Sequence, residues 1–537
     1  MKTSRSRVRL LVILLPATLP LAAPVAAQVP YERILEAASE PGNWLTYSGS
    51  YGAQRYSTLD QIDRGNVDRL QPAWIYQARS LQKFEVSPLV VDGVMYITEA
   101  PSDATALDLR TGRPLWSYRR SLPQGIVTCC GQVNRGVALL DDQVFLSTVD
   151  AHLVALDART GRVRWDIEVA DYALGYSVTV APLALKDKII VGISGGEYGI
   201  RGFLDAYDPL TGERLWRFWT VPGPGEPGHD TWSGDSWERG GAPTWVTGAY
   251  DPELDLLYWG TGNPGPDFIG DVRQGDNLYS ESLLALDPDS GELKWHFQFL
   301  PHDIHDYDST QVPVLLDAEF DGQPRQLVVF PNRNGFYYVL DRVTGEFLVG
   351  KAFAKQTWAL GLDDAGRPIE NPETIPTVDG AVVYPDDDGA ANWYSPTYSP
   401  QTNLIYQNVR EKGGVYYLAD ATYEPGKIYM GASRRVVTGE DPQGFLRALD
   451  PLSGDLVWEI AVHAPPWAGL MSTAGGLVFS GTMEGDFFAA DAQTGDVLWR
   501  FQTGGAVYAN PITYLSEGRQ FVAIAAGNSL MTFALPE

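Results

Sequence analysis

One phrase recurs along the chain and limits what it can fold into. An alternating apolar run ends at an aspartate, a Thr-Gly or Ser-Gly pair follows, and a second run ends in most copies at a tryptophan. The copies begin at Ala106, Ala155, Ala206, Ala285, Val339, Ala448 and Ala489. Each copy predicts two antiparallel strands joined by a turn whose glycine takes a positive φ. Because one hairpin cannot bury its own apolar face, we expect the units to pack side by side.

The tryptophans of the repeat predict how neighbouring units contact one another. They end the second strand of their copies at Trp116, Trp165, Trp216, Trp295, Trp458 and Trp499, and Trp74 has a similar setting. Their spacing, roughly 40 to 50 residues where no insertion intervenes, is typical of four-stranded propeller blades. The repeats plus a divergent copy, residues 392–409, predict an all-β protein: an eight-bladed β-propeller with tryptophan-anchored blades. We expect it to form a single domain over residues 28–537.

The N-terminus predicts export. An apolar run follows a basic start, and small residues at 25–27 suit cleavage before Gln28. Pro16 and Pro20 argue against a transmembrane helix, which needs about 20 unbroken apolar residues. Residues 1–27 are therefore expected to be a signal peptide and the mature protein to be periplasmic. No later stretch is long and apolar enough to span a membrane.

The charge of the chain bears on its partners. The formal net charge is −27 at pH 7. Such an acidic balance argues against binding to nucleic acid or to an anionic membrane surface. It favours a basic protein partner, although a general acidic surface explains the charge equally well.

Several stretches do not belong to the repeat. The only two cysteines, Cys129 and Cys130, are adjacent and so cannot link distant parts of a fold. Glu197 lies among glycines in "ISGGEYGIRG", which suits a metal ion or a flat ligand, or is a plain turn. Asn263 lies in "GTGNPGP", whose G-x-G-x-x-G spacing would suit a dinucleotide only if a helix followed. The prolines there argue against a helix and leave the Asn263 amide oxygen as a candidate cation ligand.

Acidic residues crowd the stretch "PHDIHDYDSTQ". Crowded carboxylates repel one another unless a cation or a proton lies between them. A zinc site from His302 and His305 would need further ligands in a recognisable pattern, and none is present. Oxygen ligands favour a calcium-like ion instead. Arg333, at the end of an apolar strand, is expected either to face the central channel or to form a surface salt bridge.

Together these motifs resemble the pyrroloquinoline quinone (PQQ) dependent alcohol dehydrogenases of bacterial periplasms. The resemblance rests on "CCGQVNRG", "SGGEYGIRG", "YWGTGNPGP", "HDYD", "FPNRNGFYYVLDR" and "NWYSPTYSP", in the order of the family. It implies an eight-bladed propeller that binds PQQ and one metal ion and oxidises small alcohols to aldehydes. The chain has no C-x-x-C-H haem motif, so the electrons are expected to pass to a separate cytochrome c.

The resemblance also implies the site residues. Cys129 and Cys130 would form a disulfide against one face of the quinone, and Trp245 would stack on the other. Asp306 would take the hydroxyl proton while hydride passes from the alcohol to the quinone. The further cofactor contacts would be Glu85, Arg135, Thr148, Ser194, Gly195, Gly196, Arg333, Asn392, Trp393 and Trp467. The metal ligands would be Glu197, Asn263, Asp306 and Asp308.

Asp308 bears on which metal binds. Calcium-type members of the family carry a small residue two positions after the base, and an aspartate there resembles the lanthanide-dependent branch. A third carboxylate balances a trivalent ion better than a divalent one, so we expect a lanthanide, with calcium as the alternative. The alternative is that Asp308 does not bind the metal ion and only forms a hydrogen bond with a neighbouring loop.

Three other functions compete with this interpretation. They are a PQQ-dependent sugar dehydrogenase, a hydrolase with paired carboxylates and a non-enzymatic envelope scaffold. The hydrolase would not explain the adjacent cysteines or Arg135, and the scaffold would not need the cysteines together with Glu197, Asn263 and Asp306. The sequence leaves the oligomeric state open, a homodimer included.

Overall fold

The computed structural model describes residues 28–126 and 128–537, so the expected signal peptide lies outside the described residues. Helices are short there: α1 spans Tyr31–Leu35, and single 3-10 turns span Ala37–Ser39, Val67–Arg69, Tyr172–Leu174, Gly196–Tyr198, His229–Thr231, Ser236–Arg239 and Pro372–Thr374. Across the described ranges, no helix has the length and apolar character that a membrane span requires.

The strands form antiparallel four-stranded sheets in chain order. The first three sheets are β3 (Leu89–Val91), β4 (Val94–Glu99), β5 (Asp103–Asp108) and β6 (Pro114–Tyr118); β7 (Val137–Leu140), β8 (Gln143–Thr148), β9 (His152–Asp157) and β10 (Val163–Glu168); and β11 (Leu183–Leu185), β12 (Lys188–Gly192), β13 (Phe203–Tyr207) and β14 (Arg214–Trp219). The next two are β15 (Ala249–Asp251), β16 (Leu256–Gly260), β17 (Ser282–Leu286) and β18 (Leu293–Gln298); and β19 (Val314–Phe320), β20 (Gln323–Pro331), β21 (Phe336–Asp341) and β22 (Phe347–Ala352).

The later sheets are less regular. One contains β26 (Thr397–Ser399), β27 (Leu404–Glu411), β30 (Gln443–Leu449) and β31 (Leu456–Val462), and the next contains β32 (Met471–Thr473), β33 (Leu477–Gly481), β34 (Asp486–Asp491) and β35 (Val497–Gln502), with β1 (Tyr56–Ser57) parallel to β32. The last contains β36 (Ile512–Ser516), β37 (Arg519–Ala526), β38 (Ser529–Ala534) and β2 (Gln71–Gln77). Two small sheets are insertions: β23 (Ala359–Leu362) with β24 (Pro368–Glu370), and β25 (Ala381–Val383) with β28 (Gly414–Leu418) and β29 (Ala432–Val436).

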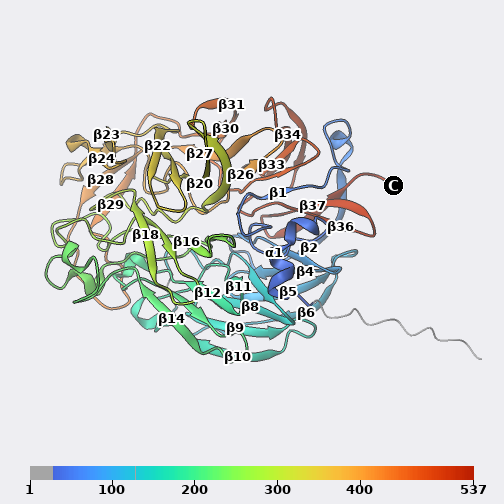
Figure 1. Ribbon diagram of the computed structural model, residues 1–537, viewed down its shortest axis with the longest axis horizontal. Coiled ribbons are helices and arrows are strands. Elements are labelled where there is room, and N and C mark those ends of the chain that lie inside the picture. Colours follow the sequence, from blue (N-terminus) through green and yellow to red (C-terminus); the bar gives the residue numbers. More distant parts are fainter. Residues whose placement is uncertain (1–27, 127) are drawn as a thin grey trace, which may run out of the picture.

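The sheets follow one another around a common centre as a β-propeller (Figure 1). The colours in Figure 1 therefore run around the molecule, and the blue strand β2 belongs to the same sheet as the red strands β36 and β37. The edge strand β2 is antiparallel to β38, so strands from opposite ends of the described chain share one sheet. Burial follows position within a sheet: β4 is buried along its whole length, whereas the outermost strand β6 is partly exposed.

The repeated phrase forms the last hairpin of a sheet, and its turn is built from the aspartate, threonine and glycine. In the first copy the Asp108 carboxylate accepts hydrogen bonds from the backbone N–H of Thr111 at 2.9 Å and from its hydroxyl at 2.7 Å. Gly112 follows with φ +68°, a conformation that L side chains rarely adopt. These residue types therefore specify the turn locally.

The tryptophan of each hairpin reaches the turn of the neighbouring sheet. Trp116 Nε1 donates to the carbonyl of Ala158 at 2.9 Å. A Cβ on Gly161 of that turn would lie 2.5 Å from the Trp116 ring, so only glycine leaves room for the indole. Equivalent indole-to-carbonyl hydrogen bonds are made by Trp74, Trp165, Trp216, Trp295, Trp458 and Trp499.

Two details of the repeat differ from the sequence interpretation. Residues 392–409 are not a separate copy, because β26 and β27 pair with β30 and β31 of the copy that begins at Ala448. A further sheet comes instead from β2 together with the strands that follow the last copy. The copy at Val339 has no terminal tryptophan, and Tyr337 takes this place: its hydroxyl donates to the carbonyl of Pro451 at 2.9 Å, and its ring packs against Gly454.

Candidate active site

The topology brings the expected site residues to one end of the sheets. In a four-stranded antiparallel sheet, the connection between the second and third strands and the connection to the next sheet lie at the same end. Glu197 lies between β12 and β13, Asn263 between β16 and β17, and Arg333 between β20 and β21. The connections between successive sheets carry Glu85, Cys129, Cys130, Arg135, Trp245, Asp306, Asp308, Asn392, Trp393 and Trp467.

These loops surround a cavity of about 350 Å³, within the size range of small-molecule sites. Most of the expected residues line it, namely Glu85, Cys129, Cys130, Arg135, Ser194, Gly195, Glu197, Trp245, Asp306, Asp308, Arg333, Asn392, Trp393 and Trp467. Gly196 and Asn263 do not line it but lie together behind the wall, since a Cβ on Gly196 would be 2.5 Å from Asn263 Oδ1. Thr148 also lies outside the lining.

Thr148 has a local role in the structure. Its hydroxyl accepts from the backbone N–H of His152 at 3.3 Å and so closes the turn between β8 and β9. The threonine that lines the cavity is Thr179, whose hydroxyl accepts from Arg135 Nη1 at 2.8 Å and lies 2.9 Å from Ser194 Oγ. The assignment of Thr148 to the cavity therefore does not fit this geometry, and Thr179 is the hydroxyl that meets Arg135.

Arg135 lies between two aromatic rings at the cavity wall. Its guanidinium carbon is 4.8 Å from the ring centre of Trp245 and 5.0 Å from that of Trp393. Its Nη2 is 2.9 Å from Glu85 Oε2, a buried carboxyl whose pKa is raised because burial disfavours its charged form. A cation between flat rings offers donors for a carboxylate and stacking faces for a planar ligand.

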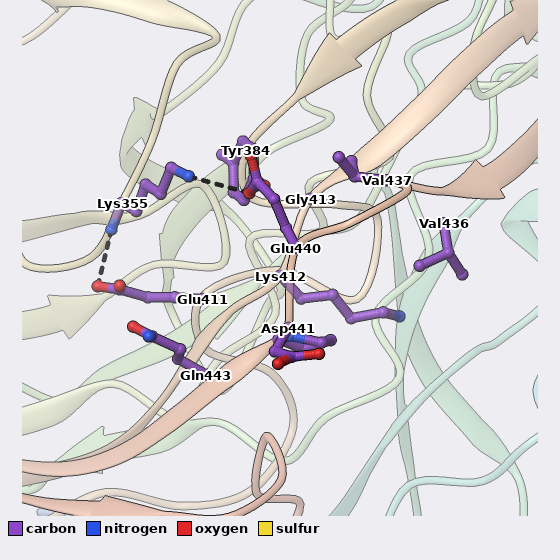
Figure 2. Close-up of a pocket in the computed structure, with 11 residues that line it drawn as sticks. Lys355, Tyr384, Glu411, Lys412, Gly413, Val436, Val437, Glu440, Asp441 and Gln443 are labelled. Carbon is purple, nitrogen blue, oxygen red and sulfur yellow. Dashed lines mark hydrogen bonds and ion pairs between the residues drawn. The ribbon is translucent and has the colours of Figure 1, made fainter.

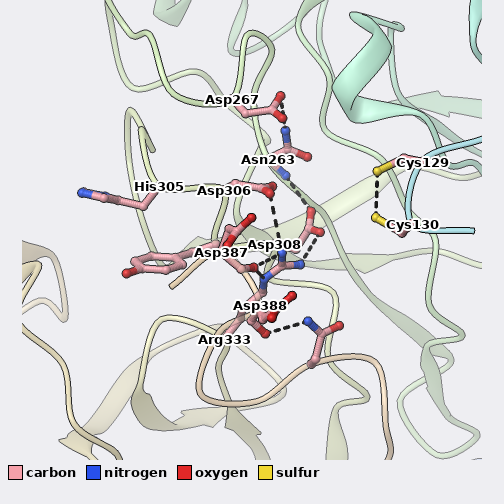
Figure 3. A network of polar contacts seen from close by, with 12 residues as sticks. Cys129, Cys130, Asn263, Asp267, His305, Asp306, Asp308, Arg333, Asp387 and Asp388 are labelled. Atoms are coloured by element: carbon pink, nitrogen blue, oxygen red, sulfur yellow. Dashed lines mark hydrogen bonds and ion pairs between the residues drawn. The ribbon is translucent and has the colours of Figure 1, made fainter. Parts of the chain in front are cut away.

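The adjacent cysteines form another part of the wall. Their Sγ atoms lie 2.7 Å apart as free thiols, and Cys130 has φ +61°. Together with Glu197 they form a cluster whose ligand atoms all lie within 4.8 Å of one another. The rigid peptide between the two residues thus holds both sulfur atoms side by side at the cavity wall (Figure 3), close to the carboxylate of Glu197.

Asp308 is the most extensively hydrogen-bonded acid of the site. One oxygen accepts from the backbone N–H of Asn263 at 2.9 Å, and the other accepts from Trp245 Nε1 at 3.1 Å and from Arg333 Nη1 at 2.6 Å. Burial nevertheless raises the pKa of Asp308, and the positive charge of Arg333 opposes that rise. Asp308 therefore joins the loops of Asn263 and Arg333 (Figure 3), and that of Trp245, to its own.

Asp306 is held less tightly and faces the cavity. Its backbone has φ +62°, unusual for a non-glycine residue, and such strain is often found at functional sites. Arg333 Nη2 lies 3.6 Å from one carboxylate oxygen, and the other, Oδ1, has no hydrogen-bond partner among the described residues. Burial raises the pKa of Asp306 well above its usual range. An acid in this state has an oxygen available for a proton or a cation.

The oxygen atoms here fit a hard metal ion. Within the described part of the chain, the side-chain oxygen of Asn263 is fully buried and also lacks a hydrogen-bond partner. Glu197 is buried as well, and its pKa is raised by desolvation and by the charge of Asp308. Unpartnered buried oxygens are costly unless a cation or a donor meets them. Carboxylate and amide oxygens are ligands that calcium-like cations prefer.

Other lining residues were not predicted from the sequence. They are Lys83, Val133, Ser177, Thr179, Pro243, Asp387, Asp388, Met430 and Arg434. Met430 and Arg434 come from the inserted segment that contains β29, and Arg434 forms an ion pair with Asp387. The carbonyl of Asp387 in turn accepts from Arg333 Nε at 2.7 Å. The run of acids "DDDG" at 386–389 was the one sequence feature that could have drawn attention to this wall.

A second pocket, of about 270 Å³, is lined by residues between Lys355 and Gln443 (Figure 2). Its two lysines already have acidic partners: Lys355 lies 3.4 Å from Glu440, and Lys412 lies 2.8 Å from Asp388. The pocket has no pair of flat walls such as Arg135 has with its two tryptophans. We therefore assign the chemistry to the cavity of about 350 Å³ that Arg135 and the tryptophans line.

The alternative motif interpretations find no support. The glycine-rich stretch 260–265 leaves β16 without entering a helix, so it is no dinucleotide-binding turn. The imidazoles of His302 and His305 are engaged by backbone carbonyls of Gly275 and Thr374, at 2.9 and 3.2 Å. Neither histidine belongs to the possible metal-binding group found in the described residues.

Comparison with known proteins shows the family to which the chain belongs. The family model described as "PQQ: Glucose/ethanol/alcohol dehydrogenase, beta-propeller domain" matches residues 44–352 and 440–522. The quinoprotein alcohol dehydrogenase PedH of Pseudomonas putida is 41% identical, over 93% of this chain and 89% of that protein. The lanthanide-dependent methanol dehydrogenase of Methylacidiphilum fumariolicum is 38% identical, over 92% and 86%.

Solved structures of the same family have the same fold as this chain. A europium-containing methanol dehydrogenase superposes with a TM-score of 0.89 and 34% identity, over 94% of this chain and all of that one. The quinohemoprotein alcohol dehydrogenase of Comamonas testosteroni superposes with a TM-score of 0.90 and 36% identity, over 96% and 85%. The chain belongs to the family of PQQ-dependent quinoprotein alcohol dehydrogenases.

Proposed function

We propose that this protein oxidises small alcohols to aldehydes with PQQ and one metal ion bound in the cavity that Trp245 and Asp306 line. The observation that carries the proposal is the pairing of two unpartnered buried oxygens, on Asn263 and Asp306, with the wall of Trp245, Arg135 and the adjacent cysteines. Family membership supplies the cofactor class. The relatives act on alcohols, and methanol is named for two of them.

Different residues of the cavity would contact different parts of the cofactor. Trp245 and the Cys129–Cys130 pair would hold the two faces of the planar quinone, and we propose that the cysteines are joined in the mature protein. Arg135 would hold a carboxylate of PQQ, with the hydroxyls of Thr179 and Ser194 beside it. Glu85, Gly195, Gly196, Asn392, Trp393 and Trp467 would complete the surroundings of the cofactor.

Asp306 would be the general base. Its free Oδ1 can accept the proton of an alcohol bound in the cavity, while Arg333 holds the carboxylate from the other side. PQQ, when bound, supplies the two-electron oxidant, and the metal ion supplies a Lewis acid. Arg333 would also stabilise negative charge that develops near the quinone oxygens.

Glu197, Asn263, Asp306 and Asp308 would bind the metal ion, with a lanthanide favoured and calcium as the alternative. Three carboxylates face one guanidinium here, which leaves a surplus of negative charge that a trivalent ion balances best. Asp308 Oδ1 accepts a single hydrogen bond and therefore keeps a lone pair for a cation. The hydrogen bonds from Trp245 and Arg333 are accepted by Oδ2 of Asp308, so they do not compete with metal binding by Oδ1.

The wider assignments are also proposals. Residues 1–27 would direct the protein to the periplasm, and a separate, basic cytochrome c would accept the electrons, as the net charge of −27 favours. The sheets would form a single domain of eight blades anchored by the interlocking tryptophans, with β2 and β38 joining the first blade to the last.

Reconstitution tests the proposal directly. Metal-free protein would be combined with PQQ and then titrated with calcium chloride or lanthanum chloride, while alcohols and sugars are compared by dye reduction. We expect alcohol oxidation that requires both PQQ and a metal, with lanthanum more effective than calcium.

Asp308→Ala is the matched variant for the choice of metal. It should lower activity with lanthanum more than activity with calcium, because it removes one negative charge and one oxygen ligand. Full activity with calcium that Asp308→Ala leaves unchanged would refute the lanthanide assignment. A preference for sugars would point to a sugar dehydrogenase, and activity without PQQ would overturn the proposal itself.

A further inference from the structure

An asparagine can serve as a metal ligand only when its amide is turned the right way. The side chain presents a carbonyl oxygen on one side and an NH₂ group on the other, and only the oxygen binds a cation. The two orientations occupy nearly the same space, so packing alone does not select between them. A neighbouring group must therefore form a hydrogen bond with only one end of the amide, either the oxygen or the NH₂ group.

Asp267 is that group. Asn263 Nδ2 donates to Asp267 Oδ1 at 2.8 Å, and both side chains are fully buried. A carboxylate oxygen accepts a hydrogen bond from the NH₂ group but offers nothing to a carbonyl oxygen. The NH₂ group of Asn263 consequently faces Asp267 (Figure 3), and its oxygen lies beside Gly196, the residue before Glu197.

The backbone of Asn263 is fixed by hydrogen bonds, so only the rotation of its side-chain amide can vary. Its N–H donates to Asp308 at 2.9 Å, and its carbonyl accepts from the N–H of Ala242 at 2.7 Å. With the main chain held on both sides, rotation of the terminal amide is what remains to be set.

Arg273 in turn holds the segment that carries Asp267. Its buried guanidinium donates to the carbonyl of Pro266 from Nε at 3.2 Å and from Nη2 at 3.0 Å. Nη2 also donates to the carbonyl of Asp303, at the start of the loop that contains Asp306. The position of Asp267 is thereby tied to the loop of the catalytic base.

We propose that Asp267 is a positioning residue that orients the amide of Asn263 so that its oxygen faces the metal ion, an inference that rests on the proposed function. Removal of the acceptor would let the amide turn and present NH₂ to the cation. Loss of a partner that orients a metal ligand typically weakens metal binding by about 10- to 100-fold.

Two substitutions separate orientation from charge. Asp267→Ala removes both the acceptor and the carboxylate. Asp267→Asn removes the charge but keeps a carbonyl oxygen that can accept from Asn263. If orientation matters, the Asn variant should bind metal within a few-fold of the wild type and the Ala variant about 10- to 100-fold more weakly. If the carboxylate acts only through its charge, both variants should be equally weak.

The measurement is calorimetric titration of the metal-free, PQQ-loaded protein with lanthanum chloride, and separately with calcium chloride. Thermal unfolding without metal serves as the control for folding, and Asp267→Leu replaces the Ala variant if that does not fold. If neither the Ala nor the Leu variant folds, the Asn variant alone decides: a large loss of metal affinity in Asp267→Asn overturns the inference. A wild type that binds neither ion contradicts the proposed function. A wild type that binds, with an Ala variant of equal affinity, contradicts the role of Asp267 alone.

Discussion

At the scale of single residues, Asp306 gives the sharpest prediction. Asp306→Asn keeps the shape of the side chain and removes the proton acceptor, and asparagine tolerates the positive φ at this position. Because general base catalysis contributes typically about 10²- to 10⁴-fold, we expect kcat to fall by that amount. The binding of PQQ, followed by its absorbance, should change little. A variant that turns over at nearly the normal rate would move the role elsewhere, with Glu197 the next candidate.

The adjacent cysteines give a second prediction at this scale. We expect Cys129 and Cys130 to be joined in active protein, because their sulfur atoms already lie 2.7 Å apart and the protein is proposed to be exported to an oxidising compartment. Alkylation without reduction, followed by mass spectrometry, should leave both residues unlabelled. Reduction before alkylation is the control and should label both. Two thiols that react without reduction in active protein would contradict the pairing.

Single residues also show where sequence reasoning reaches its limit. Motif position identified Glu197, Asp306 and Arg333, which do line one cavity. It selected Thr148 where the cavity wall uses Thr179, because only the fold decides which hydroxyl meets Arg135. The role of the Asp387 backbone could not be predicted either, since a carbonyl that holds Arg333 has no side-chain signature.

At the scale of elements, the contact between tryptophan and glycine predicts a test of stability. Gly161→Ala would place a methyl group 2.5 Å from the Trp116 ring at a residue with φ +68°. Strain at positive φ costs about 1–2 kcal/mol, and overpacking typically adds about 1–3 kcal/mol. We expect the free energy of unfolding to fall by about 2–5 kcal/mol, measured by denaturant titration.

Gly322→Ala is the matched control for that change. Gly322 has φ +73° but nothing within 4 Å of the added methyl group, so only the backbone strain applies. Its loss of stability should be about 1–2 kcal/mol. Equal losses in the two variants would show that the indole contact contributes nothing to stability.

The elements were predictable where the repeat is regular and not where it diverges. Asp, Thr and Gly specify each turn locally, so the hairpins follow from sequence. The pairing of β26 and β27 with β30 and β31 could not be predicted from the sequence, because β28 and β29 lie between the two halves of that sheet along the chain. The inserted strands matter for the site, since β29 carries Arg434. Strand partners across an insertion are set by tertiary packing, which a local pattern does not contain.

At the scale of the whole molecule, the arrangement of antiparallel sheets explains why the site is coherent. Every second connection within a sheet, and every connection between sheets, emerges at one end. Residues as far apart in sequence as Glu85 and Trp467 therefore line the same cavity. The spacing of the repeats was enough to predict this architecture, whereas the final sheet required β2 to be matched with strands at the other end of the chain.

That pairing of β2 with β38 has a consequence for the timing of biosynthesis. The sheet they share cannot form while β38 is still inside the ribosome, however early β2 was made. Contacts between such distant segments also form slowly, because closing a long loop costs entropy before the contact stabilises it. The ring of sheets around the cavity is therefore closed only once β38 has been made and has paired with β2. PQQ would then bind to a chain whose first and last strands already hold the walls of the cavity together.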